Sequence, residues 1–287
     1  MSSCPVLLFK EPSPEDTYES LLKLRGYEPK CVPVIHTIHA NLDALADHIV
    51  NARDRGIEGA VITSKRSCDS LSEAFALVCS KSTSSLAARS AALEFWSTIP
   101  FYVVGEATAS AVRDIQQRFQ SHGFSTIHIL GEASGTGEQL GRFITTHCKL
   151  GEHGKLLYLT GNKNRDTVAS ILSENYIPFQ ALRVYETQQR PDFESLLEAA
   201  IYPLLHDATT DSWWTVYFAP STASFAIPAA EKLLKSCQVS TRIATIGPVT
   251  TASIEEHLNL PVLVTASKPD AQSLAEAISE HDRQHLG

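Results

Sequence analysis

Short apolar runs alternate along the chain with longer segments in which apolar residues recur at helical spacing. Each apolar run is four or five residues long and is bounded by turn residues. Runs of this kind followed by helical segments are typical of βα units, in which helices cover a buried parallel sheet. The sequence therefore predicts an α/β fold with strands at 5–9, 59–63, 101–104, 126–130, 155–159, 215–219, 242–246 and 261–265.

Part of this pattern occurs twice. Residues 6–37 align without a gap with residues 156–187, so that Thr17 falls on Thr167. Three further pairs of segments are alike: 59–67 with 215–223, 101–112 with 242–254, and 126–144 with 261–278. In FYVVGEATASAV and RIATIGPVTTASI, an apolar run leads through a glycine into small residues that begin a helix. We call residues 6–37 segment A and residues 59–144 segment B, and their counterparts at 156–187 and 215–278 segments A′ and B′. The chain therefore has the order A, B, A′, B′.

These segments predict two similar parallel-sheet α/β domains, and two assemblies are compatible with their order. Either A joins B and A′ joins B′, or B joins A′ while the two chain ends form the other domain. In both assemblies the carboxyl ends of strands from two domains flank a cleft, which is the usual place for a ligand in such folds. Periodicity alone leaves both assemblies open.

The composition is that of a soluble globular protein. The chain has 287 residues, of which 43% are hydrophobic and 20% charged, enough for two domains of ordinary size. We expect a cytoplasmic location, because no apolar stretch could cross a bilayer and the first residues match neither a secretory signal nor a transit peptide. The net charge of −8 argues against nucleic acid and anionic membranes as partners, since both are bound chiefly through clustered Lys and Arg.

Motifs for a metal or a cofactor are incomplete. The cysteines are scattered without a CxxC pair, and the histidines within 147–153 and 281–285 do not supply a full set of zinc ligands. The segment GEASGTGEQLG at 131–141 follows a predicted strand, but its glycines have the spacing GxGxxxG instead of GxGxxG. P-loop and GxSxG motifs are lacking. We therefore expect no metal and no cofactor.

Short motifs are spread over almost the whole chain. They are VLLFK at 6–10, ITSKR at 62–66, VVGEATA at 103–109, GN at 161–162, VYET at 184–187, FAPSTAS at 218–224 and ATIGPVTTA at 244–252. In this order and spacing the motifs resemble those of the uroporphyrinogen-III synthases, most closely the eukaryotic members. The resemblance implies the second assembly, with residues 1–37 and 190–287 in one domain, residues 40–185 in the other, and two strands bridging them.

The resemblance also implies a reaction. Members of the family close hydroxymethylbilane, a linear tetrapyrrole with eight carboxylates, into uroporphyrinogen III without a metal or cofactor, inverting the last pyrrole ring and releasing water. The substrate also cyclises unaided but without inversion, so the enzyme has to fold the substrate and assist the loss of hydroxide. We expect a monomer that contacts hydroxymethylbilane synthase transiently.

Such a flexible anion requires hydrogen-bond donors on two surfaces, and the free N–H groups at helix N-termini supply them. Small residues at these termini allow a close approach to the backbone, and hydroxyls there bind a carboxylate or cap the helix. The residues expected to bind the substrate are Lys10, Thr63, Ser64, Arg66, Gly105, Thr108, Gly161, Asn162, Ser221, Gly247 and Thr250. The alternative roles are helix capping for the hydroxyl residues and solvent exposure for the two cations.

By the same resemblance, Tyr185 in VYET is the candidate general acid, because a phenol can donate a proton to a departing oxygen. Packing at the edge of a strand is its alternative role. The chain also departs from the family pattern, since Ala219 stands where a serine is common and Lys65 where a proline is frequent. Ser221 then has to bind a carboxylate together with backbone amides.

Two expectations remain. The Ser-rich segment 80–98 is longer than its counterpart in the second half of the chain, and we expect it to include a surface loop. A non-catalytic two-lobed protein that binds a small anion is the alternative function, because this chemistry depends so little on side chains.

Overall fold

The computed structural model describes residues 4–80, 85–163, 167–207 and 210–285. The chain forms two compact units, Met1–His36 with Gln188–Gly287 and Thr37–Thr187. The boundaries of the units fall inside two strands, β3 (Ile35–His39) and β8 (Phe179–Gln189). The chain therefore passes from one unit to the other within regular structure.

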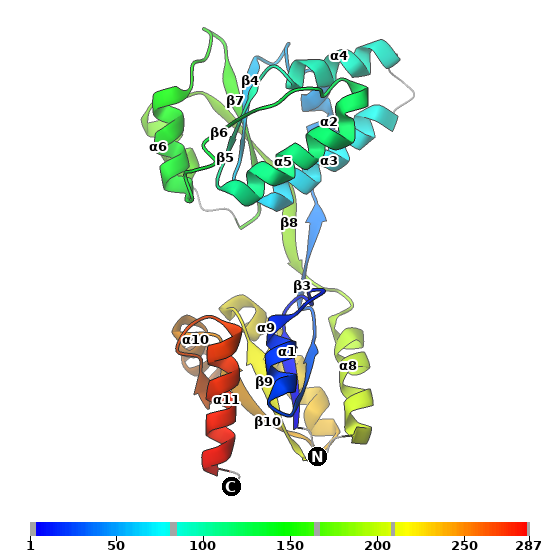
Figure 1. The fold of residues 1–287 in the computed structure, drawn as a ribbon, viewed down its shortest axis with the longest axis vertical. Helices are drawn as coiled ribbons and strands as arrows, with labels where there is room; N and C mark the ends of the chain where they lie inside the picture. The colour runs from blue at the N-terminus through cyan, green and yellow to red at the C-terminus, as the bar shows by residue number, and fades with distance from the viewer. Residues whose placement is uncertain (1–3, 81–84, 164–166, 208–209, 286–287) are drawn as a thin grey trace. The chain divides into compact units, whose positions relative to one another are not determined.

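The unit formed by the two chain ends is built on a five-stranded sheet with the order β11-β10-β9-β1-β2, in which all adjacent strands are parallel. Its strands are β1 (Cys4–Phe9), β2 (Tyr27–Cys31), β9 (Ser212–Tyr217), β10 (Ser240–Thr245) and β11 (Val264–Thr265). Its helices are α1 (Thr17–Leu24), α8 (Phe193–Asp207), α9 (Pro220–Ser236), α10 (Pro248–Leu258) and α11 (Ala271–His285). Helices α1 and α11 pack on one face of the sheet and α8, α9 and α10 on the other (Figure 1).

The contiguous unit is built on a six-stranded sheet with the order β3-β8-β7-β4-β5-β6. The further strands are β4 (Ile57–Ile62), β5 (Pro100–Val103), β6 (His128–Leu130) and β7 (Lys155–Gly161), and the pairs from β8 to β6 are parallel. The helices are α2 (Leu42–Val50), α3 (Lys65–Ser80), α4 (Leu86–Trp96), α5 (Glu106–Phe119), a short 3₁₀ turn (Gln120–His122), α6 (Gly137–His147) and α7 (Thr167–Glu174). Helices α2 to α5 cover one face, and α6 and α7 cover the other (Figure 1).

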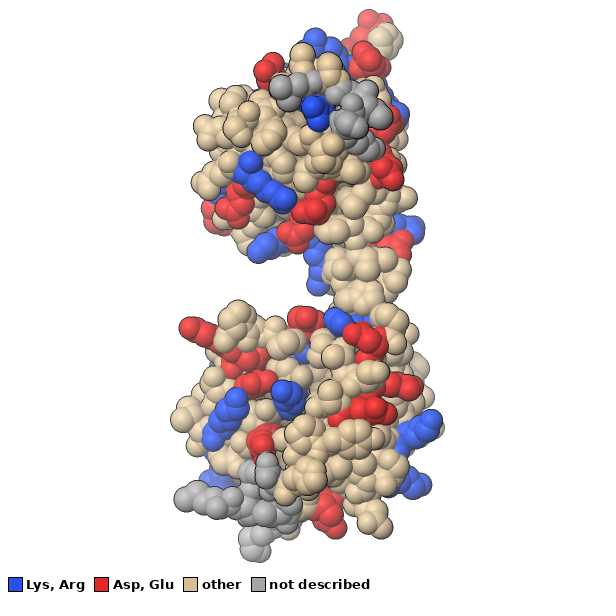
Figure 2. All heavy atoms as spheres, turned by 90° about the vertical axis from the view of Figure 1, so that its right-hand side faces the viewer, with Lys and Arg blue, Asp and Glu red and all other residues tan. Residues whose placement is uncertain are grey.

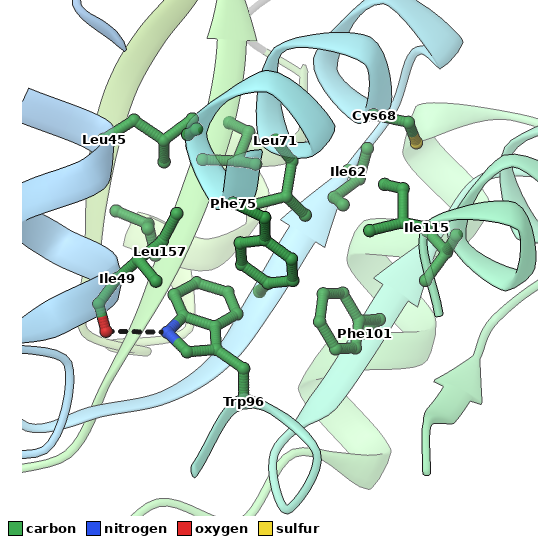
Figure 3. Close-up of a cluster of buried hydrophobic side chains, with 14 of the residues drawn as sticks. Leu45, Ile49, Ile62, Cys68, Leu71, Phe75, Trp96, Phe101, Ile115 and Leu157 are labelled. Carbon is green, nitrogen blue, oxygen red and sulfur yellow. Dashed lines mark hydrogen bonds between the residues drawn. The ribbon is translucent and has the colours of Figure 1, made fainter. Parts of the chain in front are cut away.

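An aromatic cluster forms the core on the α2–α5 face of the contiguous unit (Figure 3). The rings of Phe75 and Phe101 each lie 6.0 Å from the ring of Trp96, and all three side chains are fully buried. The Trp96 indole donates a 3.1 Å hydrogen bond to the Ile49 carbonyl, so its polar N–H group is satisfied inside the core. This packing holds helices α2 to α5 against the sheet and so fixes the position of the strand ends.

The predicted α/β class with two parallel-sheet domains is confirmed. A strand occurs at each predicted place, although the run at 261–265 is reduced to β11, two residues long, after a proline that has no N–H group for the sheet. Three strands were not among the eight strand predictions, namely β2, β3 and β8, whose sequences are rich in polar residues.

The internal repeat is visible in the structure. Helices α1 and α7 begin at Thr17 and Thr167, the two residues that the sequence alignment superposes. The order β11-β10-β9-β1-β2 matches the order β6-β5-β4-β7-β8, so the A segment shares its sheet with B′ and the A′ segment with B. In the Ser-rich segment 80–98, helix α4 occupies Leu86–Trp96, and residues 81–84 lie outside the described part.

Candidate functional site

Both sheets lead into the same kind of corner. In the contiguous unit, β5 ends at Val103 and Gly105 is the N-cap of α5. In the other unit, β10 ends at Thr245 and Gly247 is the N-cap of α10. Neither helix start has a side-chain cap. The first N–H groups of α5 are therefore left for other acceptors. At α10 the first residue, Pro248, has no N–H group, and the Thr250 N–H group donates to Gly247 O at 3.1 Å, which leaves the Val249 N–H group for another acceptor.

The backbone around the two corners is also alike. The Val104 N–H group donates to the carbonyl of Ile62 on the adjacent strand at 3.3 Å, and the Ile246 N–H group donates to that of Tyr217 at 3.1 Å. These bonds hold the chain to the sheet just before it turns into the helix. The repeated sequence segments thus fold into equivalent strand-turn-helix corners.

The threonines of the two corners are buried. Thr108 is 5% exposed and Thr250 is 3% exposed. By contrast, the preceding residues Ala107 and Val249 are exposed, the latter by 74%. The accessible polar groups of these helix starts are therefore chiefly backbone N–H groups rather than the two threonine hydroxyls.

A hydroxyl network fixes the start of α10. The Thr251 hydroxyl lies 2.6 Å from that of Thr245 and 2.7 Å from that of Thr265, so one side chain links the ends of β10 and β11. Its N–H group donates to Gly247 O at 3.3 Å. The equivalent residue of α5 is the buried Ala109, which packs in the apolar core instead.

The corners after β4 and β9 differ in their caps. After β4, the Ser64 hydroxyl accepts a 3.2 Å hydrogen bond from the Arg66 N–H group, and it therefore occupies a capping role in the first turn of α3. Thr63 is partly exposed beside it, and the Arg66 side chain is exposed. After β9, Ala219 is the N-cap of α9 and offers no side-chain acceptor, while Ser221 is exposed in the first turn.

Lys10 has a structural partner. It follows β1 directly, and its ammonium group forms an ion pair with Asp16, the N-cap of α1. Asp16 also accepts from the N–H groups of Tyr18 and Glu19 at 3.1 and 3.2 Å. Burial opposes ionisation of Asp16, but hydrogen bonds from Lys10, from the Glu19 N–H group and from Ser13 outweigh it and lower the pKa of the carboxyl. Part of the Lys10 charge is therefore neutralised within the unit.

Tyr185 lies across the end of β7. A Cβ atom built on Gly161 would lie 2.3 Å from Cζ of Tyr185 and 2.7 Å from its hydroxyl, so only glycine leaves room for the ring. Within the described part of the chain, no group forms a hydrogen bond with this hydroxyl. The Asn162 amide donates to Thr187 O at 3.2 Å and accepts from Thr187 N at 3.0 Å, which ties the turn after β7 to β8.

Each unit thus presents its own set of candidate residues at the carboxyl ends of its strands. The contiguous unit holds Thr63, Ser64, Arg66, Gly105, Thr108, Gly161, Asn162 and Tyr185 along the neighbouring strands β5, β4, β7 and β8, and the other unit holds Lys10, Ser221, Gly247 and Thr250 along β1, β9 and β10.

Charge at the start of α5 is mixed. Glu106, the first residue of the helix, and Glu132 both accept hydrogen bonds from the Arg113 guanidinium, at 2.6 and 2.7 Å. Acidic and basic side chains are likewise interspersed over the face of each unit that Figure 2 presents. An anion at these corners would therefore depend on local donors and not on a broad positive field.

Some residues with a structural part in these corners were not among the predicted site residues. The capping role of Asp16 had a signal, since an aspartate precedes the helix TYESLLKL and recurs as Asp166 in the repeat. The Ser70 hydroxyl had none, because its partner on β8 becomes a neighbour only in the fold. Thr251 belongs to the small hydroxyl residues of the corner motif, but its bond to Thr265 likewise depends on the fold.

None of the helices in the described ranges has both the length and the apolar character needed to span a membrane.

Against known structures, the chain resembles the crystal structure of uroporphyrinogen-III synthetase from Helicobacter pylori, with a TM-score of 0.51 and 18% identity over 96% of this chain and 99% of that one. This likeness supports the two-domain α/β fold.

Curated relatives cover almost the whole chain. The uroporphyrinogen-III synthase of Schizosaccharomyces pombe is 27% identical over 98% of this chain and 98% of its own length. That of Saccharomyces cerevisiae is 28% identical over 97% of this chain and 96% of its own length. These relatives favour an enzyme over a non-catalytic anion-binding protein. The family model described as uroporphyrinogen-III synthase HemD matches residues 16–276, and the chain therefore belongs to the uroporphyrinogen-III synthase family.

Proposed function

We propose that the protein closes hydroxymethylbilane into uroporphyrinogen III, with inversion of the last pyrrole ring and loss of water. Membership of the family supports this assignment. The structural observation that carries it is the pair of uncapped helix starts at Gly105 and Gly247, because backbone N–H groups there suit the carboxylates of a highly anionic substrate.

In this proposal the backbone binds and the side chains assist. The N–H groups of the first turn of α5, and those that follow Pro220 in α9 and Pro248 in α10, receive carboxylates. The absence of bulky side chains at Gly105 and Gly247 permits the approach. Apart from the glycine itself and its chain neighbours, no atom of the described residues lies within 4 Å of a Cβ built at either position. The exposed Val249 supplies apolar surface for a pyrrole ring beside the α10 start. Ser221, Thr63, Ser64 and Arg66 add polar contacts, whereas the burial of Thr108 and Thr250 assigns them mainly to holding their helices.

Tyr185 acts as the general acid in this proposal. Its hydroxyl lies at the end of β7 beside a glycine, and it donates its proton to the hydroxyl group that leaves the substrate as water. The cation that remains then attacks within the folded tetrapyrrole. The role of the protein is to hold the substrate in a shape from which ring closure with inversion of the last pyrrole is faster than closure without inversion.

The cellular and quaternary setting belongs to the same proposal. We propose a cytoplasmic monomer that receives its unstable substrate through transient contact with hydroxymethylbilane synthase. Its two domains would be residues 1–37 with 190–287 and residues 40–185, which accords with the way the sheets divide the chain.

The test is a product analysis. Purified protein is mixed with hydroxymethylbilane generated in place by its synthase, the products are oxidised, and the type I and type III uroporphyrins are separated by chromatography. A shift from type I to type III is expected. Type I alone would overturn the proposal and leave an anion-binding protein with this fold.

A further inference from the structure

Strand β8 carries an irregularity at the place where Tyr185 emerges. Leu159 pairs with Leu182 and Thr160 with Arg183, but Gly161 pairs with Tyr185. Val184 is therefore an extra residue without a partner in β7, which makes a bulge. Bulges of this kind change the direction of the side chains that follow them.

The bulge decides which side chain covers Gly161. In a regular strand, successive side chains point to opposite faces, so Val184 would stand beside Gly161 and Tyr185 would point away. Here Val184 is fully buried in the core beneath α3, and the Tyr185 ring packs against the same core cluster. The bulge thus brings both residues to one face and places the phenol over Gly161.

The backbone carbonyl of the extra residue, Val184, has two donors outside β7, and one of them is Ser70 of α3. The Ser70 hydroxyl donates to Val184 O at 2.8 Å, and the Ala40 N–H group donates to the same oxygen at 2.8 Å. Ser70 is 0% exposed. His39 Nδ1 lies 2.9 Å from its oxygen and, when the single hydroxyl proton points to Val184, serves as a donor to Ser70.

Two amides hold the strand on either side of the bulge. The Asn41 amide donates to Arg183 O at 2.9 Å, one residue before Val184. The Asn162 amide makes its two bonds with Thr187, two residues after Tyr185. The segment that carries the phenol is therefore fixed at three successive points, of which only the one at Ser70 is buried beyond the reach of a substrate.

We propose that Ser70 is a positioning residue for Tyr185, which stabilises the bulge at Val184 and thereby keeps the phenol over Gly161. This inference rests on the proposed function of Tyr185 as the proton donor. Without the Ser70 hydroxyl, the buried Val184 carbonyl keeps one donor instead of two, and the bulge competes with a regular register that turns Tyr185 away. Ser70 touches neither substrate nor reacting atoms.

The chain offers a matched control. Ser67, on the same helix, is also 0% exposed and donates to a strand carbonyl, Leu159 O, at 3.2 Å, but this carbonyl lies in β7 and outside the bulge. Ser70→Ala and Ser67→Ala therefore each remove a buried hydroxyl bond to a strand carbonyl at sites one turn apart. Ser70→Ala also removes the contacts of this hydroxyl with His39 and with the Arg66 carbonyl of its own helix. A general loss of stability would affect both variants alike.

Steady-state kinetics give the first readout. Ser70→Ala is expected to lower kcat roughly tenfold with KM unchanged, because misplacing a reacting group slows chemistry without weakening binding. Ser67→Ala is expected to keep the wild-type kcat. In the Tyr185→Phe background, itself expected to lose roughly a hundredfold in kcat, adding Ser70→Ala should change nothing further. An equal tenfold loss in that background would overturn the inference.

A spectroscopic readout separates this inference from the proposed function. With 3-fluorotyrosine at position 185, the ¹⁹F resonance should be single in the wild type and in Ser67→Ala, and shifted or split in Ser70→Ala. If Ser70→Ala does not fold, Asn162→Ala, which removes the two bonds of an exposed amide to Thr187, is expected to give the same spectral change. An unchanged resonance overturns the positioning role. A changed resonance together with full activity of Tyr185→Phe upholds positioning and overturns the catalytic role of Tyr185.

Discussion

The corners at Gly105 and Gly247 have the same plan but differ in backbone, charge and support. Gly105 has φ 77° and ψ 161°, a conformation open almost only to glycine, whereas Gly247 has φ 173° and ψ 169°, which is ordinary extended backbone. Helix α5 begins with Glu106 and α10 with Pro248. Glycine is thus required by the backbone conformation at position 105, whereas at position 247 it only leaves space beside the helix start. Sequence similarity does not reveal this difference.

Substitution of valine for each glycine should give the largest difference between the two corners. Gly105→Val should lower the free energy of unfolding by about 2 kcal/mol, because a β-branched residue is strained at this φ. Gly247→Val should leave the free energy of unfolding nearly unchanged, since its backbone suits any residue and, beyond the chain neighbours, no described atom lies within 4 Å of the new Cβ. Urea denaturation measures both, and equal losses would contradict the distinction. Both variants should raise KM, because each obstructs the approach to a helix start.

The start of α1, which has a side-chain cap, provides a contrast to the two uncapped corners. Asp16→Asn keeps a cap but ends the ion pair with Lys10, and it should lower the free energy of unfolding by about 1.5 kcal/mol at neutral pH. A carboxyl whose pKa is lowered in the folded state stabilises the fold above its unfolded pKa, and this contribution is lost as the pH falls through the folded value. The difference between wild type and variant should therefore shrink below pH 3.8, the ordinary value for this carboxyl. A difference independent of pH would argue against the ion pair.

Thr251 supports only the Gly247 corner, because Ala109 stands at the equivalent place in the other. Thr251→Val removes the hydroxyl bonds to Thr245 and Thr265 and should lower the free energy of unfolding by about 1 kcal/mol. Thermal or urea unfolding measures the change, with the exposed Ser224→Ala as a control that loses a hydroxyl bond to a backbone carbonyl in α9. A loss as small as that of the control would show that the network adds no stability.

Charge at the α5 start gives the smallest effect. Glu106→Gln removes a negative charge from a helix start that is proposed to receive carboxylates, and it should lower KM roughly twofold at low salt. Glu138→Gln, in the first turn of α6, is the control, since that helix start is already capped by Thr136. A gain that persists at high salt would point to a cause other than charge.

The sequence predicted the central strands because strands buried on both faces read as continuous apolar runs. It predicted the corners because they occur twice. Strand β8 was missing from the apolar runs because it is rich in polar residues and has only two buried positions. Its bulge was not predicted because bulges depend on pairing with a distant segment. The bonds between Asn162 and Thr187 were not predicted either, because they join the turn after β7 to another strand. The partner of Lys10 is close in the sequence instead, because Asp16 lies only six residues away. This ion pair was therefore within reach of a local reading of the sequence.

The order of strands has a consequence for synthesis on the ribosome. In the five-stranded sheet, β1 lies between β2 and β9, and the pairing of β1 with β9 joins residues as far apart in the sequence as Val6 and Trp214. The apolar residues of β1 therefore emerge long before their partner strand exists, whereas residues 37–187 emerge as one continuous stretch. We expect the contiguous unit to fold first on the nascent chain, while the apolar N-terminal strand depends on chaperones until translation nears its end.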